Sequence, residues 1–108
     1  MIKRNDLVSF LNKYFEPYQE LAEGREMLVN GLQISGADDV TGVGLGVSSS
    51  LEFMQKAQVA GYNFLIVHHG LGFSGVEKTN QFPKYLEERL RFLFQNKVSY
   101  AGYHFMLD

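Results

Sequence analysis

Phe64-Leu65-Ile66-Val67-His68-His69-Gly70 is the stretch that decides the fold, because four apolar residues run directly into two histidines and a glycine. A short, fully apolar run of this kind is typical of a strand that is buried on both faces of a parallel sheet. Immediately upstream, residues 51–60 have the pattern of a helix, which Ser49 or Ser50 can cap. Residues 43–47, before that helix, predict another strand.

Downstream of the histidines, the sequence predicts a second helix and a further strand. Pro83 suits the first turn of a helix that continues to Asn96, and residues 98–103 predict the strand after it. Strand, helix, strand, helix and strand in this order predict βαβ crossovers. The expected fold class is therefore α/β, with three layers and a mainly parallel or mixed sheet. Four apolar side chains of the second helix are expected to face the core: Leu86, Leu90, Leu93 and Phe94.

The N-terminal third of the sequence adds a helix and a short strand. Apolar residues recur at helical spacing from Leu7 to Phe15, and Asn5 stands where it can cap this helix. Residues 31–34 predict the strand. At 108 residues the chain has the length of one domain, so we expect a single α/β domain over residues 1–108.

Composition argues against several classes of protein. The net charge is −2, and the ten basic and twelve acidic residues are scattered along the chain. Without a basic stripe, nucleic-acid binding is not expected. No apolar run approaches the ~20 residues that a membrane span needs, and the charged N-terminus lacks the apolar core of a signal peptide, so we expect a cytoplasmic protein. The sequence has no cysteine, so any metal must be bound through nitrogen and oxygen.

All three histidines fall at the predicted carboxyl ends of two strands. His68 and His69 end one strand, and His104 ends the next strand along the chain, which a crossover can bring alongside the first. This edge is where open α/β sheets place their ligands. Asp108 lies four residues after His104, and the two side chains can share a metal if Phe105 begins a helical turn. Such ligands suit zinc, iron, manganese, nickel or cobalt, so ligand type does not select the metal.

The two adjacent histidines leave alternatives open. Neighbouring residues in an extended strand point to opposite sides, so His68 and His69 are not expected to chelate one ion together. They would contact different ions of a pair, or one would be a ligand and the other a support. A histidine at a strand end is also often a packed or hydrogen-bonded residue, and purely structural histidines are the competing interpretation.

The sequence resembles a known family at three places. Leu65-Ile66-Val67-His68-His69-Gly70-Leu71 resembles the His-His signature of the Nif-three-like dinuclear metal-centre proteins, many of which are GTP cyclohydrolase I type 2 homologues. Tyr100-Ala101-Gly102-Tyr103-His104-Phe105-Met106-Leu107-Asp108 is similar to the second signature, a strand that ends in His and is followed by Leu-Asp. Asn30-Gly31-Leu32-Gln33-Ile34 resembles a family segment near the N-terminus.

The resemblance implies that His68, His69, His104 and Asp108 are ligands of a site for two divalent metal ions. It also implies that the remaining ligands, a histidine and a glutamate, come from a later part of the family architecture. We therefore expect this domain to be the N-terminal part of a longer architecture. One departure lies after the strand that precedes the first crossover helix, where family members commonly carry aspartate and this chain has Gly46-Val47-Ser48-Ser49.

Two functions follow from this resemblance. In the first, the protein is a metal-dependent hydrolase acting on a nucleotide or a phosphoester-like small molecule. Two cations would polarise the substrate and lower the pKa of a bridging water, so no protein nucleophile is required. In the second, the protein is a non-catalytic metal-binding protein or a protein-interaction scaffold. The family also implies homo-oligomers, with which the low net charge and the nine Phe and six Tyr residues agree.

Overall fold

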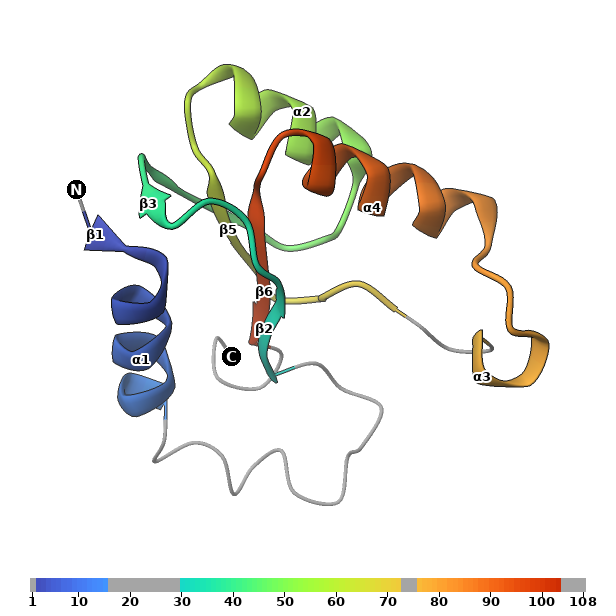
Figure 1. Cartoon of the computed structure of the whole chain (residues 1–108), viewed down its shortest axis with the longest axis horizontal. Coiled ribbons are helices and arrows are strands. Elements are labelled where there is room, and N and C mark those ends of the chain that lie inside the picture. Colours follow the sequence, from blue (N-terminus) through green and yellow to red (C-terminus); the bar gives the residue numbers. More distant parts are fainter. Residues whose placement is uncertain (1, 16–29, 73–75, 104–108) are drawn as a thin grey trace.

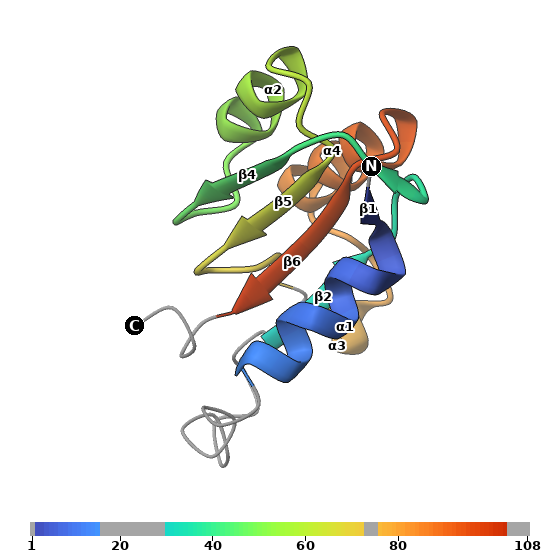
Figure 2. The same ribbon diagram turned by 90° about the vertical axis from the view of Figure 1, so that its left-hand side faces the viewer.

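The computed structural model describes residues 2–15, 30–72 and 76–103 (Figure 1). Its elements, in chain order, are β1 (Ile2–Lys3), α1 (Arg4–Phe15), β2 (Asn30–Ile34), β3 (Asp39–Val40), β4 (Val43–Gly46), α2 (Leu51–Val59), β5 (Phe64–Val67), α3 (Val76–Thr79), α4 (Lys84–Gln95) and β6 (Ser99–Tyr103). Four strands form the central sheet, with α1 against one face and α2 and α4 against the other (Figure 2). The two short strands β1 and β3 pair with each other.

The strand order of the four-stranded sheet is β2-β6-β5-β4. Strands β4, β5 and β6 are parallel, and β2 joins β6 in the antiparallel direction. The connections from β4 through α2 to β5, and from β5 through α4 to β6, are βαβ crossovers. The expected three-layer α/β fold with a mixed sheet is therefore confirmed. The strand that precedes the two adjacent histidines also lies beside the strand that precedes the third.

Side chains of the two central strands alternate between two cores. Leu65, Val67 and Tyr100 pack into the core on the side of α2 and α4, whereas Ile66 and Tyr103 pack into the core on the side of α1. None of these side chains is more than 6% exposed. Because these strands are buried on both faces, β5 consists of four consecutive apolar residues.

The start of α1 differs from the prediction that Asn5 caps it. The helix begins at Arg4, so Asn5 lies within its first turn. Immediately before the helix, β1 pairs with β3, and the Arg4 N–H donates to the Asp38 carbonyl oxygen at 2.6 Å. This pairing satisfies a backbone donor of the first turn that a capping side chain would otherwise serve. The prediction was wrong because the pairing partner lies far away in the sequence.

One expected core residue of α4 is exposed. Leu86, Leu90 and Leu93 are buried as predicted, but Phe94 is 60% exposed. Each residue of an α-helix is turned by about 100° from the one before it. Leu93 already lies within the buried stripe, so Phe94 points past the edge of that stripe.

The helices of this fold are short. α1 and α4 have 12 residues each, and α2 has nine. Within the part of the chain that the structure describes, no helix is long and apolar enough to cross a membrane. This agrees with the lack of a long apolar run in the sequence.

Candidate metal centre

The two adjacent histidines lie at the carboxyl end of β5, beside the end of β6. The two strands are parallel and Val67 is paired with Gly102, so both strands end at the same edge of the sheet. His68 is half-buried and His69 is exposed. The centroids of their imidazole rings are 4.4 Å apart, with 55° between the ring planes. The edge predicted to hold a metal site therefore carries two imidazoles close together.

The proximity of these rings differs from the expectation that His68 and His69 point to opposite sides. β5 ends at Val67, so the pair lies in a bend and not in an extended strand. The His68 N–H donates to the Gly46 carbonyl oxygen at 3.2 Å, and the His69 N–H donates to the Val47 carbonyl oxygen at 2.8 Å. These bonds hold the bend against the end of β4, and strand alternation no longer applies to it.

Hydrogen bonds from Ser49 and Arg89 hold the bend on the side of α2 and α4. The Ser49 hydroxyl donates to the His69 carbonyl oxygen at 2.7 Å. Arg89, on α4, donates from Nε to the Ser49 carbonyl oxygen at 2.6 Å and from Nη1 to the Tyr85 carbonyl oxygen at 2.8 Å. Hydrogen bonds from a charged donor are stronger than neutral ones. Ser49 and Arg89 therefore fix the backbone that carries the histidines.

Gln33, on β2, anchors the other side of the bend. Its Nε2 donates to the Leu71 carbonyl oxygen at 2.8 Å, and the Leu71 N–H donates to its Oε1 at 2.7 Å. Leu71 is only 1% exposed, so these bonds satisfy backbone groups with little access to water. Sequence reasoning did not assign Gln33, Ser49 or Arg89 to the site. The signal available for Gln33 was a carboxamide between two apolar residues of a predicted strand.

Tyr100 packs in the core close to Ser49 and Arg89. Its side chain is fully buried, and burial raises the pKa of its phenol to about 12, although Ser49 and Arg89 oppose the shift. Although Ser49 is close enough to influence this pKa, the hydroxyl makes no hydrogen bond of normal geometry with any described residue. The phenol is therefore protonated and neutral at physiological pH.

The other two predicted ligands, His104 and Asp108, lie outside the described residues, as do residues 73–75 of the loop after the histidines. Across residues 2–15, 30–72 and 76–103, no three His, Cys, Asp or Glu side chains lie close enough together to hold a metal ion. The described part of the candidate centre is therefore the pair of adjacent histidines. The four-ligand site stays a prediction.

The described histidine pair is chemically suited to a metal centre. Imidazole nitrogen is the commonest metal ligand in proteins. Hydrogen bonds to the backbone around the pair fix the place from which the two side chains start.

Comparison with known proteins finds relatives along the whole chain. The family described as Duf34/NIF3 (NGG1p interacting factor 3) matches residues 2–108. A GTP cyclohydrolase 1 type 2 homolog from Archaeoglobus fulgidus is 30% identical over 105 residues, which cover 95% of this chain and 39% of the relative. A homolog of the same name from Deinococcus radiodurans is 34% identical over 107 residues, which cover 99% of this chain and 38% of the relative.

Solved structures have the same fold over nearly the whole chain. A crystal structure of a Thermus thermophilus protein matches with a TM-score of 0.81 at 31% identity, covering 98% of this chain and 41% of that one. Reduced HcgD from Methanocaldococcus jannaschii matches with a TM-score of 0.78 at 27% identity, covering 99% of this chain and 41% of that one. The chain thus spans about two fifths of the length of these relatives.

Proposed function

This chain belongs to the Duf34/NIF3 family, and we propose that it provides His68, His69, His104 and Asp108 to a centre for two divalent metal ions. We propose further that the complete protein is a hydrolase acting on a nucleotide or a phosphoester-like small molecule. The observation that carries the proposal is the pair of imidazoles, 4.4 Å apart, at the edge where β5 and β6 both end.

The sheet topology supports the grouping of these ligands. His104 directly follows Tyr103, the last residue of β6, and β6 is the neighbour of β5. Asp108 is four residues further on, and one helical turn would bring its carboxylate to the same side as the His104 imidazole. Three imidazoles and one carboxylate do not fill two coordination shells. Water, or ligands from the additional length that the relatives have, would complete them.

In the proposed chemistry this chain binds the two metal ions and holds them in place for the substrate. When bound, two divalent cations supply Lewis acidity and lower the pKa of a bridging water, so no side-chain nucleophile is needed. His68 and His69 would bind as neutral imidazoles from a backbone that Ser49 and Gln33 anchor. Zinc, iron, manganese, nickel and cobalt all suit such ligands. The relatives are named GTP cyclohydrolase 1 type 2 homolog, which supports a nucleotide substrate and a hydrolytic reaction.

Bound metal per chain, measured by inductively coupled plasma mass spectrometry, tests the metal centre. We expect near-stoichiometric metal after incubation with zinc, manganese or iron, and a clear loss in His68→Ala and His104→Ala. Gln58→Ala, at an exposed position of α2, is the matched control and should retain the metal. Absence of metal after all three incubations, or equal metal in every variant, would refute the centre.

A screen of nucleotides and phosphoesters then tests the hydrolase. It should use the complete protein loaded with metal, and its His68→Ala variant, which is expected to lose the metal, as the background. Turnover that depends on the metal would support the proposal. A loaded protein that turns over no substrate would refute the hydrolase and leave the metal centre standing.

A non-catalytic protein-interaction scaffold that forms homo-oligomers is the second candidate. Phe10 and Tyr14 on α1 favour it, because their side chains are 60% and 61% exposed and their rings stack with centroids 6.0 Å apart. Exposed aromatic side chains are enriched at protein interfaces. Light scattering should then give a multiple of 12.3 kDa that Phe10→Ser with Tyr14→Ser reduces to the monomer. A monomer at every concentration would contradict this candidate.

A further inference from the structure

β4 is an edge strand with outward-facing backbone groups. Its neighbour on one side is β5, and the described strands place none on the other side. Gly42 and Gly46 accept hydrogen bonds at 3.2 Å from N–H groups at the two ends of β5, so the alternate glycines turn their backbone groups toward β5. In a parallel ladder the residues between them turn theirs away. The N–H and C=O groups of Val43 and Leu45 are therefore directed outward.

This edge strand is short, with four residues, but its sequence lacks the charges and proline that often protect sheet edges. Residues 43–47 contain no charged residue and no proline, which are the usual barriers to strand addition. Val43, Leu45 and Val47 are 39%, 72% and 62% exposed. In contrast, Phe64 of the neighbouring strand is fully buried in the core on the side of α1. Within the described part of the chain, the outer edge of β4 is thus apolar and unpaired.

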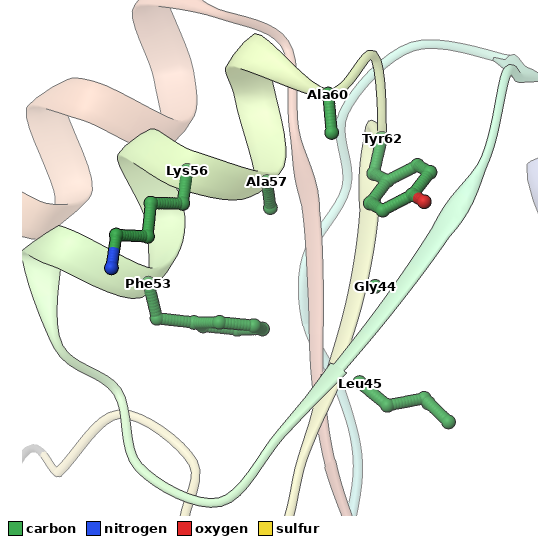
Figure 3. A pocket seen from close by; sticks show the side chains of 7 residues that line it. All are labelled: Gly44, Leu45, Phe53, Lys56, Ala57, Ala60 and Tyr62. Atoms are coloured by element: carbon green, nitrogen blue, oxygen red, sulfur yellow. The ribbon is translucent and has the colours of Figure 1, made fainter.

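A pocket adjoins β4 on the opposite face, toward α2 (Figure 3). The rings of Phe53 and Tyr62 lie on two sides of it, Gly44 lies between them, and the pocket has a volume of about 220 Å³. Ala57 lines it from α2. A Cβ atom at Gly44 would lie 2.9 Å from Leu65 Cδ2, so this position of β4 cannot carry a side chain without displacing its neighbours. The strand therefore does not fill the pocket itself.

We propose that β4 docks an extended, uncharged segment of a partner protein, which adds to the sheet as a further strand and places one aliphatic side chain between Phe53 and Tyr62. Residues of the segment opposite Val43 and Leu45 would exchange backbone hydrogen bonds with them. The residue between these two would lie opposite Gly44, with its side chain on the same face, toward α2. Backbone pairing then provides affinity and the pocket provides selectivity.

The pocket selects this occupant over a second copy of the chain. The positions of β4 that face α2 are glycines, so β4 of a second copy would bring a glycine to Gly44 and leave the pocket empty. Lys56 at the rim is paired with Glu52 at 3.0 Å, so this part of the rim has no net charge. A partner segment with an uncharged leucine, isoleucine or valine is complementary to both features. The proposal does not depend on the metal centre.

Amide exchange measured by NMR on the isotopically labelled chain tests this proposal. The probe is a seven-residue peptide with capped ends and the sequence Lys-Thr-Val-Leu-Val-Thr-Lys. Its central leucine is the residue meant for the pocket. Without peptide, the amides of Val43 and Leu45 should exchange quickly, while those of Gly44 and Gly46, which face β5, should exchange slowly. With peptide, the Val43 and Leu45 amides should become protected, and the ring resonances of Phe53 should shift.

Control peptides and two variants separate the contributions. N-methylation of both valines removes two donors and should weaken binding about thirty-fold. Glycine in place of the central leucine leaves the pocket empty and should weaken binding about tenfold or more. On the protein, Leu45→Pro removes an outward N–H and should abolish binding, whereas the matched Leu45→Thr keeps it. The peptide controls use the unmodified chain, so they hold even where Leu45→Pro fails to fold.

Several results would overturn the proposal. Equal binding of the N-methylated peptide would exclude strand addition, and equal binding of the glycine peptide would exclude the pocket. No change with the leucine peptide at millimolar concentration would exclude the docking site. Slow exchange at Val43 and Leu45 without peptide would also overturn it. Protection that grows with protein concentration would identify a second copy, and protection independent of concentration would identify a segment of the same chain.

Discussion

Replacing Gln33 by methionine should destabilise the fold strongly, because one side chain serves two backbone groups. The carboxamide pairs with the N–H of Leu71 at 2.7 Å and with its C=O at 2.8 Å. Methionine has a similar length but neither donates nor accepts strongly. Both backbone groups of Leu71, a residue that is 1% exposed, would then lose their partners. The bend that carries the histidines would also lose its anchor on β2.

The size of the effect follows from the burial of these groups. A buried polar group left without its partner costs about 1–3 kcal/mol. Gln33 is only half-buried, so water can replace part of the interaction and the lower end of that range applies to each group. The two groups together give a loss of about 2–3 kcal/mol in the free energy of unfolding. For a domain of this size, such a loss lowers Tm by roughly 10–20 °C.

Urea unfolding followed by circular dichroism measures this loss. Gln58→Met is the matched control, because Gln58 is exposed on α2, and its effect should stay within about 0.5 kcal/mol. The dependence on urea concentration should be the same for both variants, since the surface exposed on unfolding does not change. If Gln33→Met matches the control, the two bonds to Leu71 do not stabilise the fold and the proposed anchor is wrong.

Three further predictions concern the bend, the core and the surface. Ser49→Ala should lower stability by about 1 kcal/mol and weaken zinc binding about tenfold in calorimetric titration; unchanged affinity would contradict the anchoring of His69. Stability of the unmodified chain should fall as pH rises from about 10 toward 12, because burial raises the pKa of Tyr100 to about 12 and the unfolded chain releases its proton first. Tyr100→Phe should flatten that slope in urea unfolding, and at neutral pH it should leave stability unchanged or raise it by up to about 1 kcal/mol, since the hydroxyl it removes has no partner in the described structure. The hydrogen bond and charge of Lys3 lower the pKa of Asp39 in the folded state. The ionised carboxylate should therefore stabilise the fold above the pKa it has in the unfolded chain, and this contribution should be lost as pH falls through its pKa in the folded state. An acid unfolding curve that Asp39→Asn leaves unchanged would contradict this.

The sequence predicted those elements whose signals are local. The apolar run of β5 indicated a doubly buried strand, and the helix that follows β4 has the expected ends. Ser50 caps α2 by accepting a hydrogen bond from the Phe53 N–H. Gly61, just after the helix, has φ +89°, a conformation that glycine adopts readily. The alternation of these elements predicted the βαβ crossovers, but not the full strand order β2-β6-β5-β4.

Contacts between distant segments were beyond local patterns. The pairing of β1 with β3 sets the start of α1. This start could not be predicted from Asn5 and its neighbours in the sequence. Gln33 and Leu71 are 38 residues apart, so their pairing could not be read from either neighbourhood. The rings of His68 and His69 come together because β5 ends at Val67. The two histidines therefore lie in a bend, where side chains do not alternate between the two faces as they do in a strand. Of the four predicted ligands, only these two lie in the described structure.

Neighbouring positions of β4 differ in the substitutions that they tolerate. At Gly44 even a methyl group would lie 2.9 Å from Leu65 Cδ2, so a repelling lysine or glutamate there would require Leu65 to shift. Leu45, at 72% exposure, can carry a charged side chain without displacing a neighbour. Leu45→Lys is therefore the change we would make to keep concentrated samples from aggregating. A descendant that lost its binding partner would be expected to acquire a charge at this position first.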